Sequence, residues 1–309
     1  MANLFTPVFI GGTGRSGTTI VLNLLSRHPD FHGSMPREIK YLTSRHGLID
    51  LVFTRPMRFE ENLRARRNNL VARLLPLTGR SQIDSFEQEI FGAWWSGTSK
   101  KGTTRGLVQG IPREILEREV EAFKTQYGDN RIGAARQFFE SLSQAQMQDK
   151  PRRYFGDSTP VNMMQSDLIF KLLPHSKFIN VIRDGRDVAA SVVKERWGPV
   201  EHYSALKWWE NRICQAHSSL TRIPKERILE IRIEDLVVHE RESTLQRILT
   251  FLNLEHSSRL EKYFADEVIP ERLHAGRWKA EVADPEKFEG SYLQILNRLD
   301  SKGIDVKRF

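Results

Sequence analysis

The chain has 309 residues, with 47 Lys and Arg against 39 Asp and Glu, and its formal net charge is +8. This length suits one large α/β domain or two small ones and allows a sizeable core. No segment approaches the roughly 20 apolar residues of a membrane span, and the N-terminus lacks the pattern of a signal peptide. The single Cys214 excludes an internal disulfide framework and a multi-cysteine zinc site, so we expect a cytoplasmic protein. The positive charge favours an anionic partner without choosing among a nucleotide, a nucleic acid, an acidic polymer and a membrane surface.

Short apolar runs alternate with helical patterns along the chain. We predict strands at 7–10, 153–155, 177–182 and 227–233, and helices at 16–28, 161–173, 187–196, 203–220 and 242–252. This alternation predicts an α/β fold with a central parallel sheet flanked by helices. Residues from about 48 to 150 have mainly helical patterns, interrupted by a loop at 96–110 that is rich in Gly, Thr and Lys. We interpret them as a helical insertion within a single domain that spans 1–309.

A glycine-rich loop at 11–19, GGTGRSGTT, connects the first predicted strand to the first predicted helix. Its glycines allow a tight turn and a close approach of the backbone to a ligand, and the N–H groups that open the helix favour an anion. Arg15 adds a forked cation, and Thr18 and Thr19 add hydroxyl donors. A plain glycine-rich turn is the simpler alternative. The spacing also fits the phosphate-binding loop G-x-x-x-x-G, but Thr18 replaces its Lys, which counts against triphosphate chemistry.

The loop resembles that of the sulfotransferases that use 3′-phosphoadenosine 5′-phosphosulfate (PAPS). Their 5′-phosphosulfate loop has the form G-x-x-[RK]-[SGT]-G-T-[TRS], which residues 12–19 match. The resemblance implies a P-loop-like sulfotransferase fold. It also implies that the donor is bound by Gly14, Arg15, Ser16, Gly17, Thr18 and Thr19.

A second phosphate motif of the same family is an apolar strand, then Arg, then Ser eight residues later. The strand at 177–182 is followed by Arg183 and, eight residues on, by Ser191. From spacing alone, a surface Arg and a Ser on a helix face are the simpler interpretation. The resemblance implies instead that this pair binds the 3′-phosphate. Arg277 falls where the family has a basic loop over that phosphate, although a surface turn fits it equally well.

Two further stretches follow the family order. Residues 156–160, GDSTP, resemble its G-[ED]-K-[ST]-P segment, but Ser158 stands where many members have Lys. This departure puts a charged contact from residue 158 in doubt. Residues 231–237, IRIEDLV, resemble its R-Y-E-D-L strand end, which we interpret as structural.

Sulfuryl transfer needs a base that takes the proton of the acceptor. Residues 36–42, PREIKYL, resemble the E-[VI]-[HQK]-[FY]-[FL] segment of the carbohydrate O- and N-sulfotransferases, which implies that Glu38 is the base. Taken alone, a Glu beside Arg37 and Lys40 is an ordinary solvated residue. The cytosolic sulfotransferases use His, but no His of this chain has a recognisable catalytic setting. Arg15 is the second predicted catalytic residue, because it can stabilise negative charge on the departing phosphate. This reaction requires no metal.

The acceptor side is less defined. Seven arginines lie between 55 and 80, either as a basic face for an anionic acceptor or as the solvated side of a helix. Two Trp pairs, 94–95 and 208–209, invite a stacking role, but adjacent helix residues face different ways, so we expect one Trp of each pair in the core. The loop at 96–110 can act as a lid over the acceptor.

The sequence therefore predicts a sulfotransferase that moves the sulfuryl group of PAPS to a hydroxyl or an amine and releases 3′,5′-ADP. The acceptor stays open between a glycan, a peptide, a lipid and a metabolite, and the oligomeric state stays open too. One alternative is a P-loop kinase that uses ATP and Mg²⁺. The other is a non-enzymatic nucleic-acid binder, which rests on the pI of about 9.6 alone. Because no recognised nucleic-acid-binding motif is present, we expect no such partner.

Overall fold

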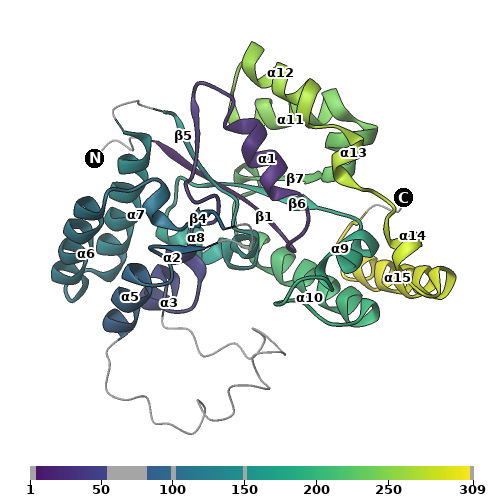
Figure 1. Cartoon of the computed structure of the whole chain (residues 1–309), viewed down its shortest axis with the longest axis horizontal. Coiled ribbons are helices and arrows are strands. Elements are labelled where there is room, and N and C mark those ends of the chain that lie inside the picture. Colours follow the sequence, from purple (N-terminus) through teal and green to yellow (C-terminus); the bar gives the residue numbers. More distant parts are fainter. Residues whose placement is uncertain (1–4, 54–81, 99–101, 149–151, 307–309) are drawn as a thin grey trace, which may run out of the picture. The chain divides into compact units, whose positions relative to one another are not determined.

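The computed structural model describes residues 5–53, 82–98, 102–148 and 152–306. The chain forms two compact units, and Figure 1 labels their helices and strands. Unit 1 consists of Met1–Val8, Asp30–Thr159 and Leu168–Ser176, and unit 2 of Phe9–Pro29, Pro160–Asp167 and Lys177–Phe309. The expected single domain with an insertion at about 48–150 stays a prediction.

Five strands form one sheet in the order β2-β5-β1-β6-β7. They are β1 (Thr6–Gly12), β2 (Phe31–Gly33), β5 (Tyr154–Asp157), β6 (Lys177–Ile182) and β7 (Ile228–Arg232). β2 runs parallel to β5, with Phe31 opposite Tyr154, and β6 runs parallel to β7, with Phe178 opposite Ile228. The predicted α/β class is confirmed, and all four predicted strands are present. β2 was missed because its three residues are too few to show the pattern of a buried strand.

The helices of unit 1 pack around an aromatic core. They are α2 (Lys40–Thr43), α3 (Leu48–Phe53), α5 (Gln82–Phe91), α6 (Arg113–Tyr127) and α7 (Arg131–Met147), several of which Figure 1 shows together. Phe86 from α5 contacts Phe123 and Phe138, with ring centroids 5.3 and 5.6 Å apart. A short hairpin, β3 (Gly97–Thr98) with β4 (Thr104–Arg105), occupies part of the predicted loop. The seven arginines between 55 and 80 lie outside the described residues.

The helices of unit 2 include three that bear on the candidate site. These are α1 (Thr18–Leu25), α9 (Gly185–Val192) and α10 (His202–Leu220). The chain continues with α11 (Arg241–Leu252), α12 (Ser258–Glu267), α13 (Pro270–Leu273), α14 (Trp278–Glu281) and α15 (Pro285–Asp300). The predicted helix at 161–173 is a 3₁₀ turn, Pro160–Gln165, in unit 2, followed by α8 (Ser166–Leu172), of which the part from Leu168 onward belongs to unit 1.

The core of unit 2 lies beneath α9 and α10. Trp209 is fully buried there against Tyr292, while Trp208 is only partly buried. In unit 1, Trp94 is buried and Trp95 half-buried. One Trp of each pair is therefore in the core, as predicted.

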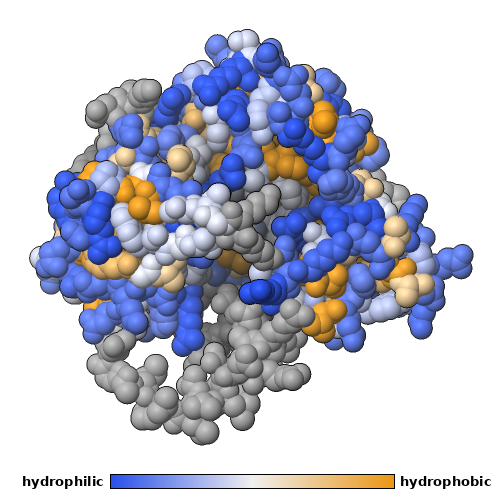
Figure 2. Space-filling model, in the orientation of Figure 1, coloured by the Kyte–Doolittle hydropathy of each residue, from blue (hydrophilic) through white to orange (hydrophobic). Residues whose placement is uncertain are grey.

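The surface of the described residues is mainly polar. Figure 2 shows hydrophilic residues over most of the visible face, with hydrophobic ones in small groups. Among the described residues, no helix combines the length and the apolar character that a bilayer crossing requires.

Candidate active site

The glycine-rich loop between β1 and α1 has a tightly constrained backbone. Gly14, Arg15 and Gly17 all have positive φ, of 93°, 59° and 91°. At Gly17 a Cβ atom would also lie 2.6 Å from the side chain of Ile233, and at Gly12 one would lie 2.3 Å from the carbonyl oxygen of Val181. Only glycine therefore fits positions 12 and 17.

Helix α1 begins at Thr18 with Gly17 as its N-cap and without a side-chain cap. The N–H groups of its first turn are therefore not satisfied by a capping side chain, which is the arrangement that receives an anion. Ser16 is 1% exposed, and its hydroxyl has no hydrogen-bond partner within the described residues. A buried hydroxyl of this kind fits a phosphate oxygen, since leaving it unpaired costs about 1–3 kcal/mol.

Arg183 follows β6 directly and is only 8% exposed. Its Nη2 donates to the carbonyl oxygen of Leu273 at 2.8 Å, and its Nη1 donates to that of Arg15 at 3.1 Å. Among the described residues it makes no ion pair with a carboxylate, and its Nε has no partner. Burial lowers the pKa of Arg183, and the charges of Asp187 and Glu234 oppose that shift. An arginine stays protonated even so, and the fold therefore holds a buried cation that hydrogen-bonds to carbonyl groups while two carboxylates lie within electrostatic range.

Arg15 connects the glycine-rich loop with the second predicted phosphate motif. Its Nε donates to Ser191 Oγ on α9 at 2.9 Å, and its backbone oxygen accepts the bond from Arg183. Its Nη1 lies 3.7 Å from Glu195 Oε1, and the Arg15 side chain is 45% exposed. The structure therefore brings together Arg15, Arg183 and Ser191, which lie in two segments far apart in the sequence. Their roles toward a nucleotide stay predictions.

The loop between α13 and α14 carries Arg277, and it begins directly after Leu273, whose carbonyl oxygen accepts the bond from Arg183 Nη2. Burial is the main cause of the lowered pKa of Arg183, and the positive charge of Arg277 lowers it further. Arg277 Nε donates to Glu281 Oε1 at 3.0 Å, and Lys194 Nζ donates to the same oxygen at 2.7 Å. All three predicted cationic ligands lie in unit 2, where Arg183 contacts the Arg15 backbone and the start of the loop that carries Arg277, and we call these three arginines the positive cluster.

Arg186, the other basic residue after β6, has a structural environment. It forms a bidentate pair with Asp184, with the shortest separation 2.6 Å, and a second pair with Glu289 at 2.5 Å. Its guanidinium lies 4.7 Å from the ring centroids of both Trp278 and Tyr292. These contacts join α9 to α14 and α15, so Arg186 stabilises the fold around the cluster.

Glu38 lies in unit 1, on an exposed segment that precedes α2. The segment is held on both sides of Glu38 by the end of β5. Ser158 donates its N–H and its hydroxyl to the carbonyl oxygen of Arg37, at 2.9 and 3.0 Å, and Asp157 Oδ1 accepts from the N–H of Ile39 at 2.9 Å. Ser158 therefore binds backbone where many family members have a Lys.

Three further residues lie beside the glycine-rich loop, and two of them, Arg212 and Trp197, were missed at the sequence level, whereas the third, Trp208, belongs to a Trp pair considered there for stacking. The Arg212 guanidinium stacks on Trp208 at 4.2 Å and donates to the carbonyl oxygen of Thr13 at 2.9 Å. Trp197 lies beside Trp208, with ring centroids 6.0 Å apart, and is 45% exposed. A Cβ atom on Gly14 would lie within 3.6–3.7 Å of all three. The i, i+4 spacing of Trp208 and Arg212 on α10 was the available signal.

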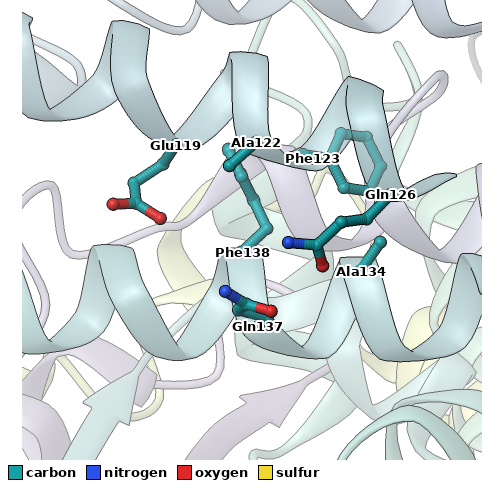
Figure 3. Close-up of a pocket in the computed structure, with 7 residues that line it drawn as sticks. All are labelled: Glu119, Ala122, Phe123, Gln126, Ala134, Gln137 and Phe138. Carbon is teal, nitrogen blue, oxygen red and sulfur yellow. The ribbon is translucent and has the colours of Figure 1, made fainter.

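A separate hollow in unit 1 does not correspond to the predicted site. Figure 3 shows it between α6 and α7, and its lining is Glu119, Ala122, Phe123, Gln126, Ala134, Gln137 and Phe138. Its cavity volume of about 10 Å³ holds one water at most, so it cannot take a nucleotide. Within the described ranges, no group of three or more His, Cys, Asp or Glu side chains is arranged to hold a metal ion.

Comparison with known proteins decides the family. The model of the sulfotransferase family matches residues 7–258, a span that contains the glycine-rich loop, Glu38, Arg183 and Ser191. The chain belongs to the sulfotransferase family. Arg277 lies beyond the matched residues.

Two curated relatives of this sulfotransferase are similar over most of its length. It is 22% identical to the protein-tyrosine sulfotransferase of Drosophila melanogaster over 252 residues, which are 80% of this chain and 38% of the relative. It is 23% identical to protein-tyrosine sulfotransferase 2 of Gallus gallus over 257 residues, 81% of this chain and 52% of the relative. The chain thus spans about half or less of these relatives' length.

Solved structures show the same fold. The sulfotransferase domain from the curacin biosynthetic pathway has a TM-score of 0.52 and 18% identity, covering 97% of this chain and 99% of that one. The sulfotransferase domain of the Synechococcus PCC 7002 olefin synthase also has a TM-score of 0.52, with 15% identity, covering 98% and 95%. The predicted P-loop-like sulfotransferase fold is confirmed by these likenesses.

Proposed function

We propose that this sulfotransferase moves the sulfuryl group of PAPS to a hydroxyl or an amine and releases 3′,5′-ADP. The observation that carries the proposal is the buried Arg183, which contacts the Arg15 backbone of the glycine-rich loop and has no carboxylate partner among the described residues. A buried cation next to an anion-binding loop suits a ligand with two separate phosphate groups.

We assign the residues of the site to the two phosphate groups of the donor as follows. Gly14, Ser16, Gly17, Thr18 and Thr19 bind the 5′-phosphosulfate through backbone N–H groups and hydroxyls. Arg183, Ser191 and Arg277 bind the 3′-phosphate. A guanidinium matches phosphate geometry with two parallel N–H bonds, and Arg183 and Arg277 each carry one.

The proposed reaction is an in-line displacement at sulfur. A lone pair of the acceptor oxygen or nitrogen forms the new bond to sulfur, while the bond from sulfur to the bridging oxygen of the 5′-phosphate breaks. Glu38 takes the acceptor proton as general base. Negative charge develops on the departing phosphate, and Arg15 with the hydroxyls of the loop stabilises it there. The scheme uses no metal.

A tyrosine side chain is the first acceptor to test. The curated relatives are named protein-tyrosine sulfotransferases, and Trp197 and Trp208 present aromatic rings beside Gly14. Aromatic rings pack on one another with a preference for tilted or offset geometry, so a phenol can lie against these two rings. Glycan, lipid and small-metabolite acceptors are the further arms of an acceptor screen with labelled PAPS. A cytoplasmic location is part of the proposal and rests on the single cysteine.

Nucleotide binding tests the proposal without knowledge of the acceptor. Isothermal titration calorimetry compares 3′,5′-ADP, ATP with Mg²⁺, and a short oligonucleotide. We expect tight binding of 3′,5′-ADP only, and a loss of about 10- to 100-fold in Arg183→Ala, because a charged hydrogen bond contributes about 1.5–3 kcal/mol. Preference for ATP with Mg²⁺ supports the kinase alternative instead, and salt-sensitive oligonucleotide binding supports the nucleic-acid alternative.

A further inference from the structure

The loop that carries Arg277 is hydrogen-bonded to α9 through the carboxylate of Asp187. Asp187 is 2% exposed, and its Oδ2 accepts from the N–H of Gly276 at 2.8 Å. Its Oδ1 accepts from the N–H of Trp278 at 3.4 Å. These two amides lie directly before and after Arg277, so Asp187 determines where the backbone of Arg277 lies.

The same loop has few internal means of keeping its shape. Residues 274–277 form no helix or strand, and His274 and Gly276 have positive φ, of 53° and 75°. A Cβ atom on Gly276 would have no heavy atom within 4 Å, so this point of the turn faces open space. The bonds to Asp187 and the bond from Arg183 Nη2 to Leu273 join the loop to the strand end and helix that follow β6, whereas its remaining bonds run to the adjoining helix α14.

Asp187 is not a ligand for a phosphate, because its carboxylate would repel one. Both of its oxygens are turned to the loop amides, and its charge interacts favourably with Arg183. The carboxylate thus combines two effects: it fixes the loop, and it compensates part of the positive charge before a nucleotide arrives.

We propose that Asp187 is a positioning residue that sets the preference for a nucleotide with a 3′-phosphate, through the placement of Arg277. This inference rests on the proposed function. Loss of the carboxylate leaves the amides of Gly276 and Trp278 unpaired and releases the Arg277 backbone. The glycine-rich loop keeps its own geometry, so affinity for the 5′-phosphate is retained.

The test measures the dissociation constants of 3′,5′-ADP and 5′-AMP by calorimetry. In Asp187→Ala we expect the affinity for 3′,5′-ADP to fall about tenfold, while that for 5′-AMP changes less than about twofold. Asp187→Asn keeps one oxygen acceptor, so we expect a smaller loss, of about threefold. If Asp187→Ala does not fold, the ratio of the dissociation constants of 3′,5′-ADP and 5′-AMP in Asp187→Asn tests the positioning role.

A double-mutant cycle separates positioning from a general structural effect. If Asp187 acts through Arg277, adding Asp187→Ala to Arg277→Ala weakens 3′,5′-ADP binding by less than about twofold further. The matched control is Glu210→Gln, which alters another buried carboxylate of unit 2, one whose hydrogen bonds within the described residues go to Arg298 and not to the positive cluster. We expect it to leave both dissociation constants unchanged.

The outcomes distinguish this inference from the proposed function. Equal weakening of 3′,5′-ADP and 5′-AMP in the Asp187 variants, full retention of 3′,5′-ADP affinity, or additive losses in the cycle each overturn the positioning role. The proposed function still stands in those cases. If wild-type protein shows no preference for 3′,5′-ADP over 5′-AMP, the proposed function fails before the variants are considered.

Discussion

Each unit has a short segment without regular structure in which side chains from elsewhere hydrogen-bond to the backbone on both sides of a charged residue. In unit 1, Asp157 and Ser158 bind the backbone on both sides of Glu38. In unit 2, Asp187 binds the backbone on both sides of Arg277. Asp157, at the end of β5, accepts one backbone N–H, and Asp187, in the first turn of α9, accepts two.

The two sets of hydrogen bonds differ in the side chain that donates alongside the carboxylate. Around Glu38 the additional donor is a neutral serine, Ser158, whose N–H and hydroxyl meet one carbonyl oxygen. Around Arg277 the additional donor is Arg183, a cation that we propose as a phosphate ligand. The first segment is therefore independent of nucleotide charge, whereas the second is linked to it. We expect changes in the first to affect turnover and changes in the second to affect binding.

The largest effect is expected at Glu38 itself. Glu38→Gln removes the proposed base with little change in size, so turnover should fall about 10²- to 10⁴-fold. Sulfuryl transfer from labelled PAPS to the acceptor found in the screen measures this, and calorimetry with 3′,5′-ADP should give an unchanged dissociation constant. Normal turnover of this variant would rule Glu38 out as the base.

The second-largest effect is expected at Asp157, which hydrogen-bonds to the backbone next to Glu38. Asp157→Ala leaves the N–H of Ile39 without its acceptor, and we expect turnover to fall about 10- to 100-fold while 3′,5′-ADP binding is kept. Asp157→Asn retains the Oδ1 acceptor and should restore most of the activity. If Asp157→Ala lowers the melting temperature but leaves turnover intact, the contact is structural and the comparison between the two segments breaks down.

Glu210 takes part in neither set of hydrogen bonds, so its substitution should affect stability alone. Hydrogen bonding to Arg298 lowers the pKa of Glu210 below its usual 4.5. A lowered folded pKa stabilises the protein above pH 4.5, and this contribution is lost as the pH falls below that value. Glu210→Gln should therefore lower the free energy of unfolding by about 1 kcal/mol at pH 7, with a shrinking difference below pH 4.5. Urea denaturation at several pH values measures it; a difference that does not depend on pH contradicts the ion-pair origin.

The smallest effect is a gain in affinity within the cluster. Glu195 lies 3.7 Å from Arg15, and a carboxylate at this distance opposes an incoming phosphate. Glu195→Gln should tighten 3′,5′-ADP binding about two- to fivefold at low salt, with less gain at high salt because the charges are screened. Titrations at two salt concentrations measure this, and weaker binding at both would show that Glu195 orients Arg15 instead.

Sequence patterns predicted four strands of the five-stranded sheet and the glycine-rich loop, because a strand that ends in glycines before a helix depends on local order. Spacing alone favoured a surface Arg183 and a Ser191 on a helix face, and the family resemblance was what singled out the residues that meet at Arg15. The roles of Asp157 and Asp187 as acceptors for distant backbone amides were not recognised from the sequence. Their partners are backbone amides about 90 to 120 residues away in the sequence, and a backbone amide carries no residue signature. Trp197 escaped for a similar reason, because its position beside Gly14 depends on how α10 packs.

The close approach at Gly12 has a consequence for redesign. A Cβ atom there would meet the backbone oxygen of Val181, and no side-chain change elsewhere can remove a backbone oxygen. A mutant library aimed at new acceptors therefore gains nothing by varying this position. Exposed Trp197, whose ring ends beside the same loop, is the place where such a library can alter the acceptor surface and leave the donor loop as it is.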